Sequence, residues 1–368
     1  MSDRDGDKKD LSPRMDNTAE ELLIAGPQLH MHDRFAPELL DLPAAELWRA
    51  LKGPTLFRIE GRQPKPLFVT VLLHGNEDTG WQAVQSVMKD AAARGLPRTM
   101  LLFVGNIEAA RANVRTLPAQ NDYNRTWPGT LSEYVPEAAV MREVIEIVRA
   151  AEPFASIDIH NNTGHNPHYA CLNELSDPFL HLARLFSRTI VYFKKPLGVQ
   201  SAAMAHVCPA VTVECGRVGG AAGVEHAAEF IHATLAMSHF PRKSLPESDI
   251  DLLQTRAILK IPEDATFSFD GRDADMRLRA DLDHLNFSEL SAGTVFGTLG
   301  GHGTRRLEVV PCGDFKLRGD YFDYQNGEIR LARPAIPSML TLDPNAIRLD
   351  CLGYLMQRIA RDGTILTP

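Results

Sequence analysis

The chain has 368 residues, of which 44% are hydrophobic and 23% charged, a globular composition long enough for two hydrophobic cores. A formal net charge of -8, with 39 basic residues and no dense basic cluster, argues against a nucleic-acid partner. Five widely spaced cysteines without a Cys-x-x-Cys pair argue against a disulfide scaffold or a cysteine zinc cluster.

The N-terminal segment is charged and polar, and residues 1–18 are predicted to form a disordered tail. This segment lacks the apolar core of a signal peptide, and no apolar run approaches the ~20 residues that span a bilayer. The sequence therefore predicts a cytoplasmic protein without a membrane partner.

Short β-branched runs alternate with longer helical patterns between about residues 35 and 240, which is typical of an α/β sheet covered by helices. We expect strands at 55–59, 67–73, 99–104, 154–159, 189–192 and 210–214. We expect helices at 44–52, 80–94, 135–151, 176–187 and 221–239.

A polar turn follows the second expected strand. The apolar run Phe68-Val-Thr-Val-Leu-Leu73 ends in His74-Gly-Asn-Glu77. A neutral imidazole and a carboxylate three residues apart can both reach one Zn²⁺ from a tight turn, and a distant third ligand would leave a position for water. The turn therefore predicts two ligands of a metal site.

The segment from Val104 to Gly129 leaves a strand without a clean helical pattern, and we expect a long functional loop. Arg115 and Arg125 lie in it. In an amidohydrolase one arginine could polarise the scissile carbonyl and the other could bind a substrate carboxylate. A solvated surface charge is the alternative for either one.

His160 ends the apolar run Ser156-Ile-Asp-Ile-His160 and is the candidate third ligand. With His74 and Glu77 it would complete the two-histidine, one-carboxylate set of catalytic zinc sites, although nitrogen and oxygen ligands do not exclude Mn²⁺ or Co²⁺. Asp158, on the same strand face, could hydrogen-bond a ligand or form a buried salt bridge elsewhere.

Glu214 ends another apolar strand, Val211-Thr-Val-Glu214. Partial desolvation would raise the pKa of this carboxyl group toward the working pH, which suits a general base that later acts as an acid. The alternative is a strand-end ion pair with Arg217.

Beyond about residue 246 the pattern changes to short strands separated by turns. We expect a β-rich domain over residues 247–368, with a hairpin at Asn326-Gly327.

Together these motifs resemble the zinc carboxypeptidase superfamily, and most closely its succinylglutamate desuccinylase and aspartoacylase branch. The matching motifs are His74-x-x-Glu77, Arg115, Asp122-x-Asn124-Arg125, Asp158-Ile-His160-Asn161-Asn-Thr163 and Thr212-Val-Glu214. They span residues 74–220. Members of this branch commonly have a proline where Ile107 stands here.

The resemblance implies a role for each matching residue. His74, Glu77 and His160 would bind one Zn²⁺ per chain, Glu214 would be the general base and acid, and Arg115 would polarise the carbonyl. Asn124, Arg125 and Asn161 would bind the substrate. A tyrosine of the C-terminal domain should also contact substrate, and Tyr321 and Tyr324 are its candidates.

The resemblance also implies a carboxypeptidase-like mixed β-sheet flanked by helices in a catalytic domain at residues 19–243, with residues 247–368 as a smaller β-rich cap over its entrance. The expected reaction is hydrolysis of a small anionic N-acyl amino acid. A carboxypeptidase acting on peptides, including cell-wall peptides, and an inactive metal-binding protein are the alternatives. The oligomeric state is left open.

Overall fold

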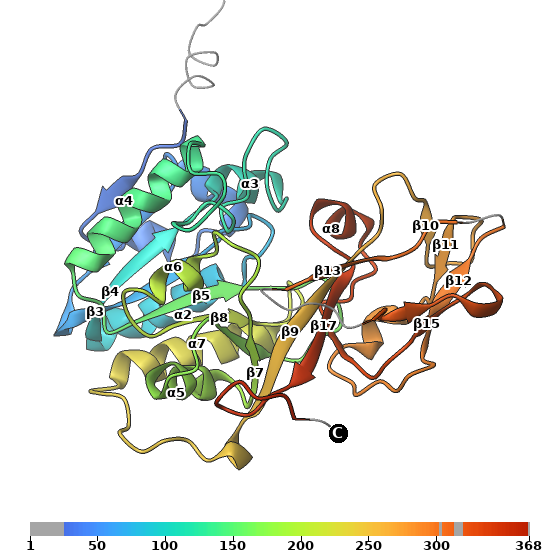
Figure 1. Ribbon diagram of the computed structural model, residues 1–368. Coiled ribbons are helices and arrows are strands. Elements are labelled where there is room, and N and C mark those ends of the chain that lie inside the picture. The colour runs from blue at the N-terminus through green and yellow to red at the C-terminus, as the bar shows by residue number, and fades with distance from the viewer. Residues whose placement is uncertain (1–25, 302–303, 313–318, 367–368) are drawn as a thin grey trace, which may run out of the picture.

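The computed structural model describes residues 26–301, 304–312 and 319–366. The protein has a larger lobe of helices and strands and a smaller lobe of short strands (Figure 1). The tail predicted at residues 1–18 lies outside the described residues. No helix in the described part is long and apolar enough to cross a membrane.

A mixed sheet of twelve strands forms the centre of the larger lobe, which confirms the expected fold class. Its spatial order is β1 (His30–His32), β2 (Thr55–Ile59), β4 (Leu96–Val104), β3 (Gly61–Val71), β5 (Ala155–His160), β8 (Ala210–Glu214), β6 (Tyr169–Leu172), β7 (Thr189–Tyr192), β9 (Asp251–Lys260), β17 (Gly353–Arg358) and β16 (Ile336–Ser338), with β13 (Glu308–Pro311) paired to β9. The central strands β4, β3, β5 and β8 are parallel. These strands carry almost continuous apolar runs, as expected for strands whose side chains are buried on both faces of the sheet.

Helices cover both faces of this sheet (Figure 1). One layer consists of α2 (Thr79–Arg94), α7 (Ala221–Ala236) and α5 (Asp177–Phe186), and the other contains α4 (Pro136–Ala150) and α6 (Gln200–Met204). In α2 the buried residues Trp81, Val84 and Met88 recur at helical spacing and form its sheet-facing stripe. Since β3 connects to β4 on one side and β4 connects to β5 on the other, right-handed crossovers place α2 and α4 on opposite faces.

The smaller lobe contains a second sheet of five short strands: β10 (Phe267–Ser268), β11 (Met276–Leu278), β12 (Val295–Leu299), β15 (Glu328–Leu331) and β14 (Phe322–Asp323). The hairpin predicted at Asn326-Gly327 is confirmed, because β14 and β15 pair in antiparallel fashion around it. Asn326 and Gly327 have positive φ, 53° and 74°, a backbone conformation that asparagine and glycine adopt more readily than other residues. Short helical segments complete the smaller lobe at η4 (Leu282–Leu285), η5 (Gln325–Gly327) and α8 (Pro344–Leu349). The segment η3 (Glu247–Asp249) lies beside α5 in the larger lobe, where Arg184 donates to the Asp249 carbonyl at 2.9 Å.

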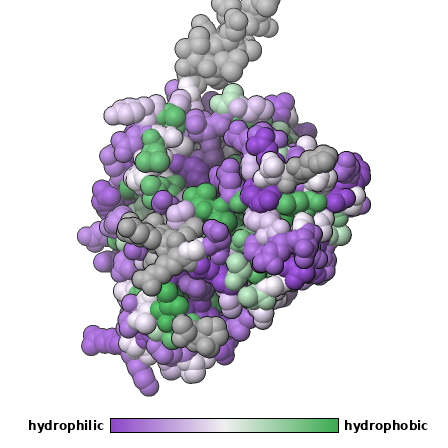
Figure 2. Space-filling view, turned by 45° about the vertical axis from the view of Figure 1, so that its right-hand side comes forward, coloured by the Kyte–Doolittle hydropathy of each residue, from purple (hydrophilic) through white to green (hydrophobic). Residues whose placement is uncertain are grey.

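The main sheet continues into the C-terminal third of the chain. β9 pairs in parallel with β7, starting at Thr189↔Asp251, and β17 pairs with β9. The second lobe therefore grows from the edge of the first through shared backbone hydrogen bonds. The face shown in Figure 2 is mostly hydrophilic, with a group of apolar side chains near its centre.

Several expected elements differ from the structure. Residues 44–52, expected as a helix, contain the 3₁₀ segment η2 (Ala44–Arg49), preceded by another, η1 (Pro37–Leu39). The expectation of no helix at 104–129 is wrong for α3 (Ile107–Ala112), whose N-cap Asn106 accepts a hydrogen bond from the Ala109 backbone at 3.1 Å. The short elements β1, β6 and α6 were not predicted.

Candidate metal centre and active site

The candidate site lies at the carboxyl ends of three neighbouring parallel strands. His74 follows β3, His160 is the last residue of β5, and Glu214 is the last residue of β8. His160 and Glu214 are direct partners in the β5–β8 register. In open α/β sheets this edge, where the connections diverge to opposite faces, is the usual place of a ligand site.

The turn that carries His74 is fixed by close backbone packing. Leu72 has a positive φ of 56°, and the Gly75 backbone N–H donates to the Arg115 carbonyl at 3.1 Å. A Cβ atom at Gly75 would lie 2.1 Å from the Ala109 carbonyl carbon in α3. Glycine is therefore required here, because α3 packs directly against the turn.

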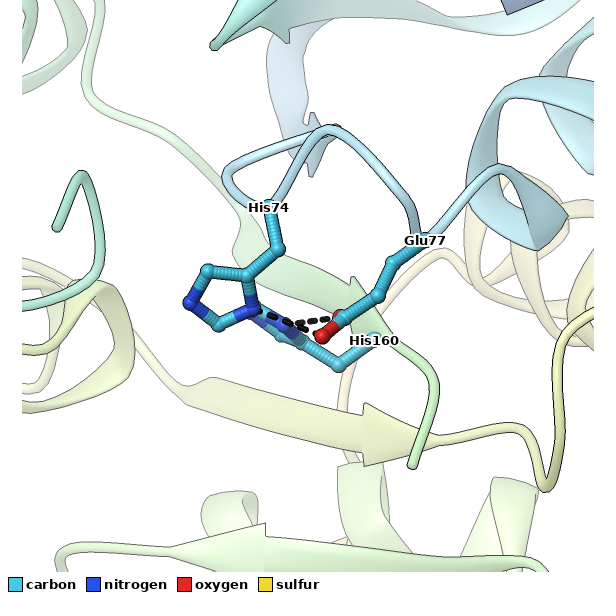
Figure 3. Close-up of side chains that lie close together, drawn as sticks. All are labelled: His74, Glu77 and His160. Carbon is cyan, nitrogen blue, oxygen red and sulfur yellow. Dashed lines mark hydrogen bonds and ion pairs between the residues drawn. The ribbon is translucent and has the colours of Figure 1, made fainter. Parts of the chain in front are cut away.

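The three predicted metal ligands converge, as Figure 3 shows. The Nδ1 atoms of His74 and His160 each lie 2.8 Å from a different carboxylate oxygen of Glu77. The candidate ligand atoms all lie within 4.8 Å of one another, and all three residues are buried. No other cluster of this kind occurs among the residues that the structure describes.

Two further carboxylates orient the imidazoles. Asp122 Oδ1 lies 3.1 Å from His74 Nε2, and Asp158 Oδ2 lies 2.9 Å from His160 Nε2. A carboxylate that accepts a hydrogen bond from the Nε2–H group keeps the proton on Nε2 and leaves the Nδ1 lone pair free for a cation. Burial alone would raise the pKa of Asp122, but His74 and Arg115 hold it well below its ordinary value, so this side chain is an anionic acceptor.

This arrangement fits a divalent metal ion. Two imidazole nitrogens and one carboxylate form the donor set of catalytic zinc sites, and each histidine already has its outer partner. The geometry favours the first of the two roles considered for Asp158, because its partners are His160, Thr70 and Thr212 and include no lysine or arginine. The contact of Asp122 with the His74 ring was not predicted, since the two residues are 48 positions apart in the sequence and only the fold brings them together.

Glu214 faces the same cavity as the ligand cluster. Burial raises the pKa of Glu214 to about 7; His160 opposes this shift, and Glu77 adds to it. The alternative of an ion pair with Arg217 is wrong, because that guanidinium lies 2.5 Å from Asp283. The Asn162 side-chain amide donates a long hydrogen bond of 3.5 Å to the Glu214 carboxyl group.

The two arginines both line the cavity, and both are held by carboxylates. Arg115 donates from Nε and a terminal nitrogen to Asp122 at 3.1 and 2.8 Å, which fixes the guanidinium beside Glu77. Arg125 pairs with Asp350 at 3.2 Å, a residue that follows α8 in the C-terminal part of the chain. The pairing of Arg125 was not predicted, because the two residues are 225 positions apart.

The two asparagines named from the sequence also lie at the site. The Asn124 amide is 3.2 Å from His160 Nε2, and its carbonyl oxygen accepts from the Gln200 backbone at 2.9 Å. Asn161 uses its backbone N–H to donate to Glu77 at 3.0 Å and its amide to donate to Gly216. The buried Oδ1 of Asn161 has no hydrogen-bond partner within the described part of the chain, and the residue lines the cavity.

The ligand cluster lines the first of two neighbouring spaces. This chamber, of about 120 Å³, is also lined by Glu214, Asn124 and Arg125 together with apolar residues such as Val191 and Phe193. The second space, a vestibule of about 690 Å³, shares Glu77 and Arg115 with the chamber.

The C-terminal part of the chain supplies part of the wall between these spaces. Met339, Asp350 and Tyr354 line both of them. Tyr321 and Tyr324, the tyrosines selected from the sequence, line neither of the two cavities: Tyr321 is buried in the core of the second lobe, and the Tyr324 hydroxyl accepts from Leu307. Tyr354 is the C-terminal tyrosine that lines them.

Comparison with protein families identifies the domain that carries this site. Residues 65–240 match the family model described as the succinylglutamate desuccinylase/aspartoacylase catalytic domain. The match contains every ligand and arginine discussed above, which confirms the resemblance drawn from the motifs. A search of curated protein sequences gives no significant match.

Solved structures share the fold at low sequence identity. A succinylglutamate desuccinylase from Chromobacterium violaceum is 16% identical, covers 81% of this chain and 86% of its own, and has a TM-score of 0.51. A succinylglutamate desuccinylase/aspartoacylase from Rhodobacter sphaeroides is 15% identical, covers 83% of this chain and 89% of its own, and has a TM-score of 0.53. Murine aminoacylase 3 is 14% identical, covers 81% of this chain and 96% of its own, and has a TM-score of 0.53.

Proposed function

We propose that the protein hydrolyses the amide bond of an N-acyl amino acid, from the premise that residues 65–240 match the succinylglutamate desuccinylase/aspartoacylase catalytic domain. The observation that carries the proposal is the buried cluster of His74, Glu77 and His160, with Glu214 at the end of the adjoining strand. The solved relatives with similar folds are described as a succinylglutamate desuccinylase and an aminoacylase.

One Zn²⁺ per chain is the proposed cofactor, bound by His74, Glu77 and His160. When bound, such an ion lowers the pKa of a water molecule and polarises the carbonyl of the scissile amide. Asp122 and Asp158 hold the two imidazoles in the tautomer that ligation requires.

Glu214 is the proposed proton carrier. With a pKa near 7 it can take a proton from water and return it to the leaving nitrogen within one cycle. The carbonyl carbon gains one bond to the water oxygen and loses its bond to nitrogen. The products are the carboxylate of the acyl group and the amino group of the amino acid.

Arg115 and Arg125 divide the remaining work in this proposal. Arg115, held by Asp122 beside Glu77, would donate to the carbonyl oxygen as negative charge develops there. Arg125 and Asn124 would bind the substrate carboxylate, and Asp350 would have to yield part of the Arg125 guanidinium. The unpartnered Oδ1 of Asn161 would accept a substrate N–H.

The chamber beside Glu214 supports a small amino acid over a peptide. Its volume of about 120 Å³ is below the ~300–1,000 Å³ of common ligand pockets. We propose that residues 247–368 act as a cap on the catalytic domain at 19–243, since Met339, Asp350 and Tyr354 wall the chamber. A peptidase would use the same catalytic residues and needs a direct test.

The test is a hydrolysis screen. Purified protein supplied with Zn²⁺ is offered N-acyl amino acids that differ in acyl group and amino acid, beside short peptides, and amine release is measured. We expect release from N-acyl amino acids. Cleavage of peptides alone would support the carboxypeptidase alternative, and no cleavage by a metal-loaded protein would refute both.

A further inference from the structure

Two spaces meet at Glu77 and Arg115, which line both of them, and the two spaces differ in size and in chemistry. The chamber has a volume of about 120 Å³ and the vestibule one of about 690 Å³. A hydrolysed amide has two halves, and each half must leave the cluster in a different direction. The unequal spaces therefore distinguish a small half of the substrate from a large one.

The position of Glu214 assigns the halves. This carboxyl group lines the chamber and is absent from the vestibule wall, whereas Glu77 and Arg115 line both. If Glu214 delivers the proton to the leaving nitrogen, the amino acid occupies the chamber, where Asn124 and Arg125 also lie. The acyl group must then extend past Arg115 into the vestibule.

Apolar side chains form part of the vestibule wall, beside polar ones. They are Val114, Leu117, Met339, Ala346 and Leu349. Val114 is 37% exposed and Leu349 is 66% exposed, which places both among the exposed large hydrophobic residues of the protein. Exposed apolar residues that gather at the mouth of a site indicate an apolar ligand group.

The cations of the vestibule are already engaged. Arg115 is bound by Asp122, as described above. Arg348 donates to the carbonyls of Pro262 and Ala265 at 2.9 and 2.5 Å and lies over the Phe267 ring. These two are the basic residues that line the vestibule in the described part of the chain, so a carboxylate at the far end of the acyl group would have to compete with Asp122 or with two backbone carbonyls for its partner.

We infer that the preferred acyl group is uncharged and hydrophobic and is longer than acetyl, of the octanoyl class. The inference rests on the proposed function and makes it more specific, because it excludes succinyl as the preferred group. Removal of methylenes from water drives the preference, at roughly fourfold in kcat/KM for each one that is fully buried.

The test measures kcat/KM for acyl derivatives of one amino acid, the best one found in the screen. The series is N-acetyl, N-butanoyl, N-octanoyl, N-succinyl and N-(4-methylpentanoyl), in which an isopropyl group replaces the succinyl carboxylate. We expect at least a roughly tenfold rise from acetyl to octanoyl. We also expect the 4-methylpentanoyl derivative to exceed the succinyl derivative.

A variant links the preference to the vestibule. Leu349→Asp should lower the octanoyl-to-acetyl ratio of kcat/KM by at least about fivefold. Leu185→Asp is the matched control, because Leu185 is also an exposed leucine, at 43%, but lies on α5 and lines neither cavity. The control should retain the wild-type ratio.

The outcomes separate this inference from the function on which it rests. Hydrolysis that is fastest for N-acetyl or N-succinyl derivatives overturns the inference and leaves the amidohydrolase function intact. A wild-type ratio in Leu349→Asp also overturns it. Absence of hydrolysis for every derivative overturns both.

Discussion

Replacing Glu214 by glutamine should remove activity and at the same time stabilise the metal-free protein. The activity loss follows because the amide cannot carry the proton, and turnover should fall by roughly 10²-fold or more. The gain in stability follows because a buried carboxylate is replaced by a neutral group of the same shape. A residue that served only to hold the fold would not show this combination.

The size of the stability gain depends on pH. The pKa of Glu214 rises from 4.5 to about 7 on folding. Below pH 4.5 the carboxyl group is protonated in both the folded and the unfolded protein, so it does not lower the free energy of unfolding of the wild type. As the pH rises toward 7 the unfolded chain releases the proton while the folded protein retains it, so the free energy of unfolding decreases. Each pH unit contributes about 1.4 kcal/mol, which gives about 3 kcal/mol above pH 7.

The assay is urea unfolding of chelator-treated protein at pH 4.5 and pH 8. The free energy of unfolding of Glu214→Gln should exceed that of wild type by about 3 kcal/mol at pH 8 and by little at pH 4.5. Glu229→Gln is the matched control, since Glu229 is an exposed glutamate on α7. Equal stability of variant and wild type at both pH values, or a variant with full turnover, would refute the role of Glu214 as a desolvated base.

Three more predictions concern the residues around it. His160→Ala should be purified with much less than one zinc ion per chain by elemental analysis, and a full complement would remove His160 from the site. Asp122→Asn should bind zinc roughly 10–100-fold more weakly in competition with a chromophoric chelator, because the His74 ring loses its anionic partner; an unaltered affinity would contradict this. Arg125→Ala should raise KM roughly tenfold or more for an N-acyl amino acid but not for its carboxamide, and equal effects on both would refute the carboxylate clamp.

The sequence predicted those parts of the fold that depend on local pattern. The apolar runs that became β2, β7 and β8 have the predicted bounds, because each lies between clear turn signals. The convergence of the three candidate metal ligands was also predicted, because two of them share one turn and all three stand at strand ends. Parallel strands bring such ends together without further information.

The residues that the sequence did not predict depend on long-range contacts. Asp350 meets Arg125 across 225 positions, and Tyr354 lines the cavities from β17. No local pattern distinguishes either residue from its neighbours. The helix α3 was missed because its six residues are too few to show a helical pattern of apolar residues. Its caps, Asn106 and Asn113, are asparagines, which are equally common in loops.

The central claim is that the cluster of His74, Glu77 and His160 makes the protein a metal-dependent amidohydrolase. The most direct measurement is amine release from the panel of N-acyl amino acids by three samples. They are wild-type protein treated with a chelator, the same protein reloaded with Zn²⁺, and the Glu214→Gln variant loaded with Zn²⁺. We predict amine release by the zinc-loaded wild-type protein and a rate of release that is at least roughly 10²-fold lower in the other two samples. Equal release with and without metal, or none from any N-acyl amino acid by a protein that binds one zinc ion per chain, would contradict the claim.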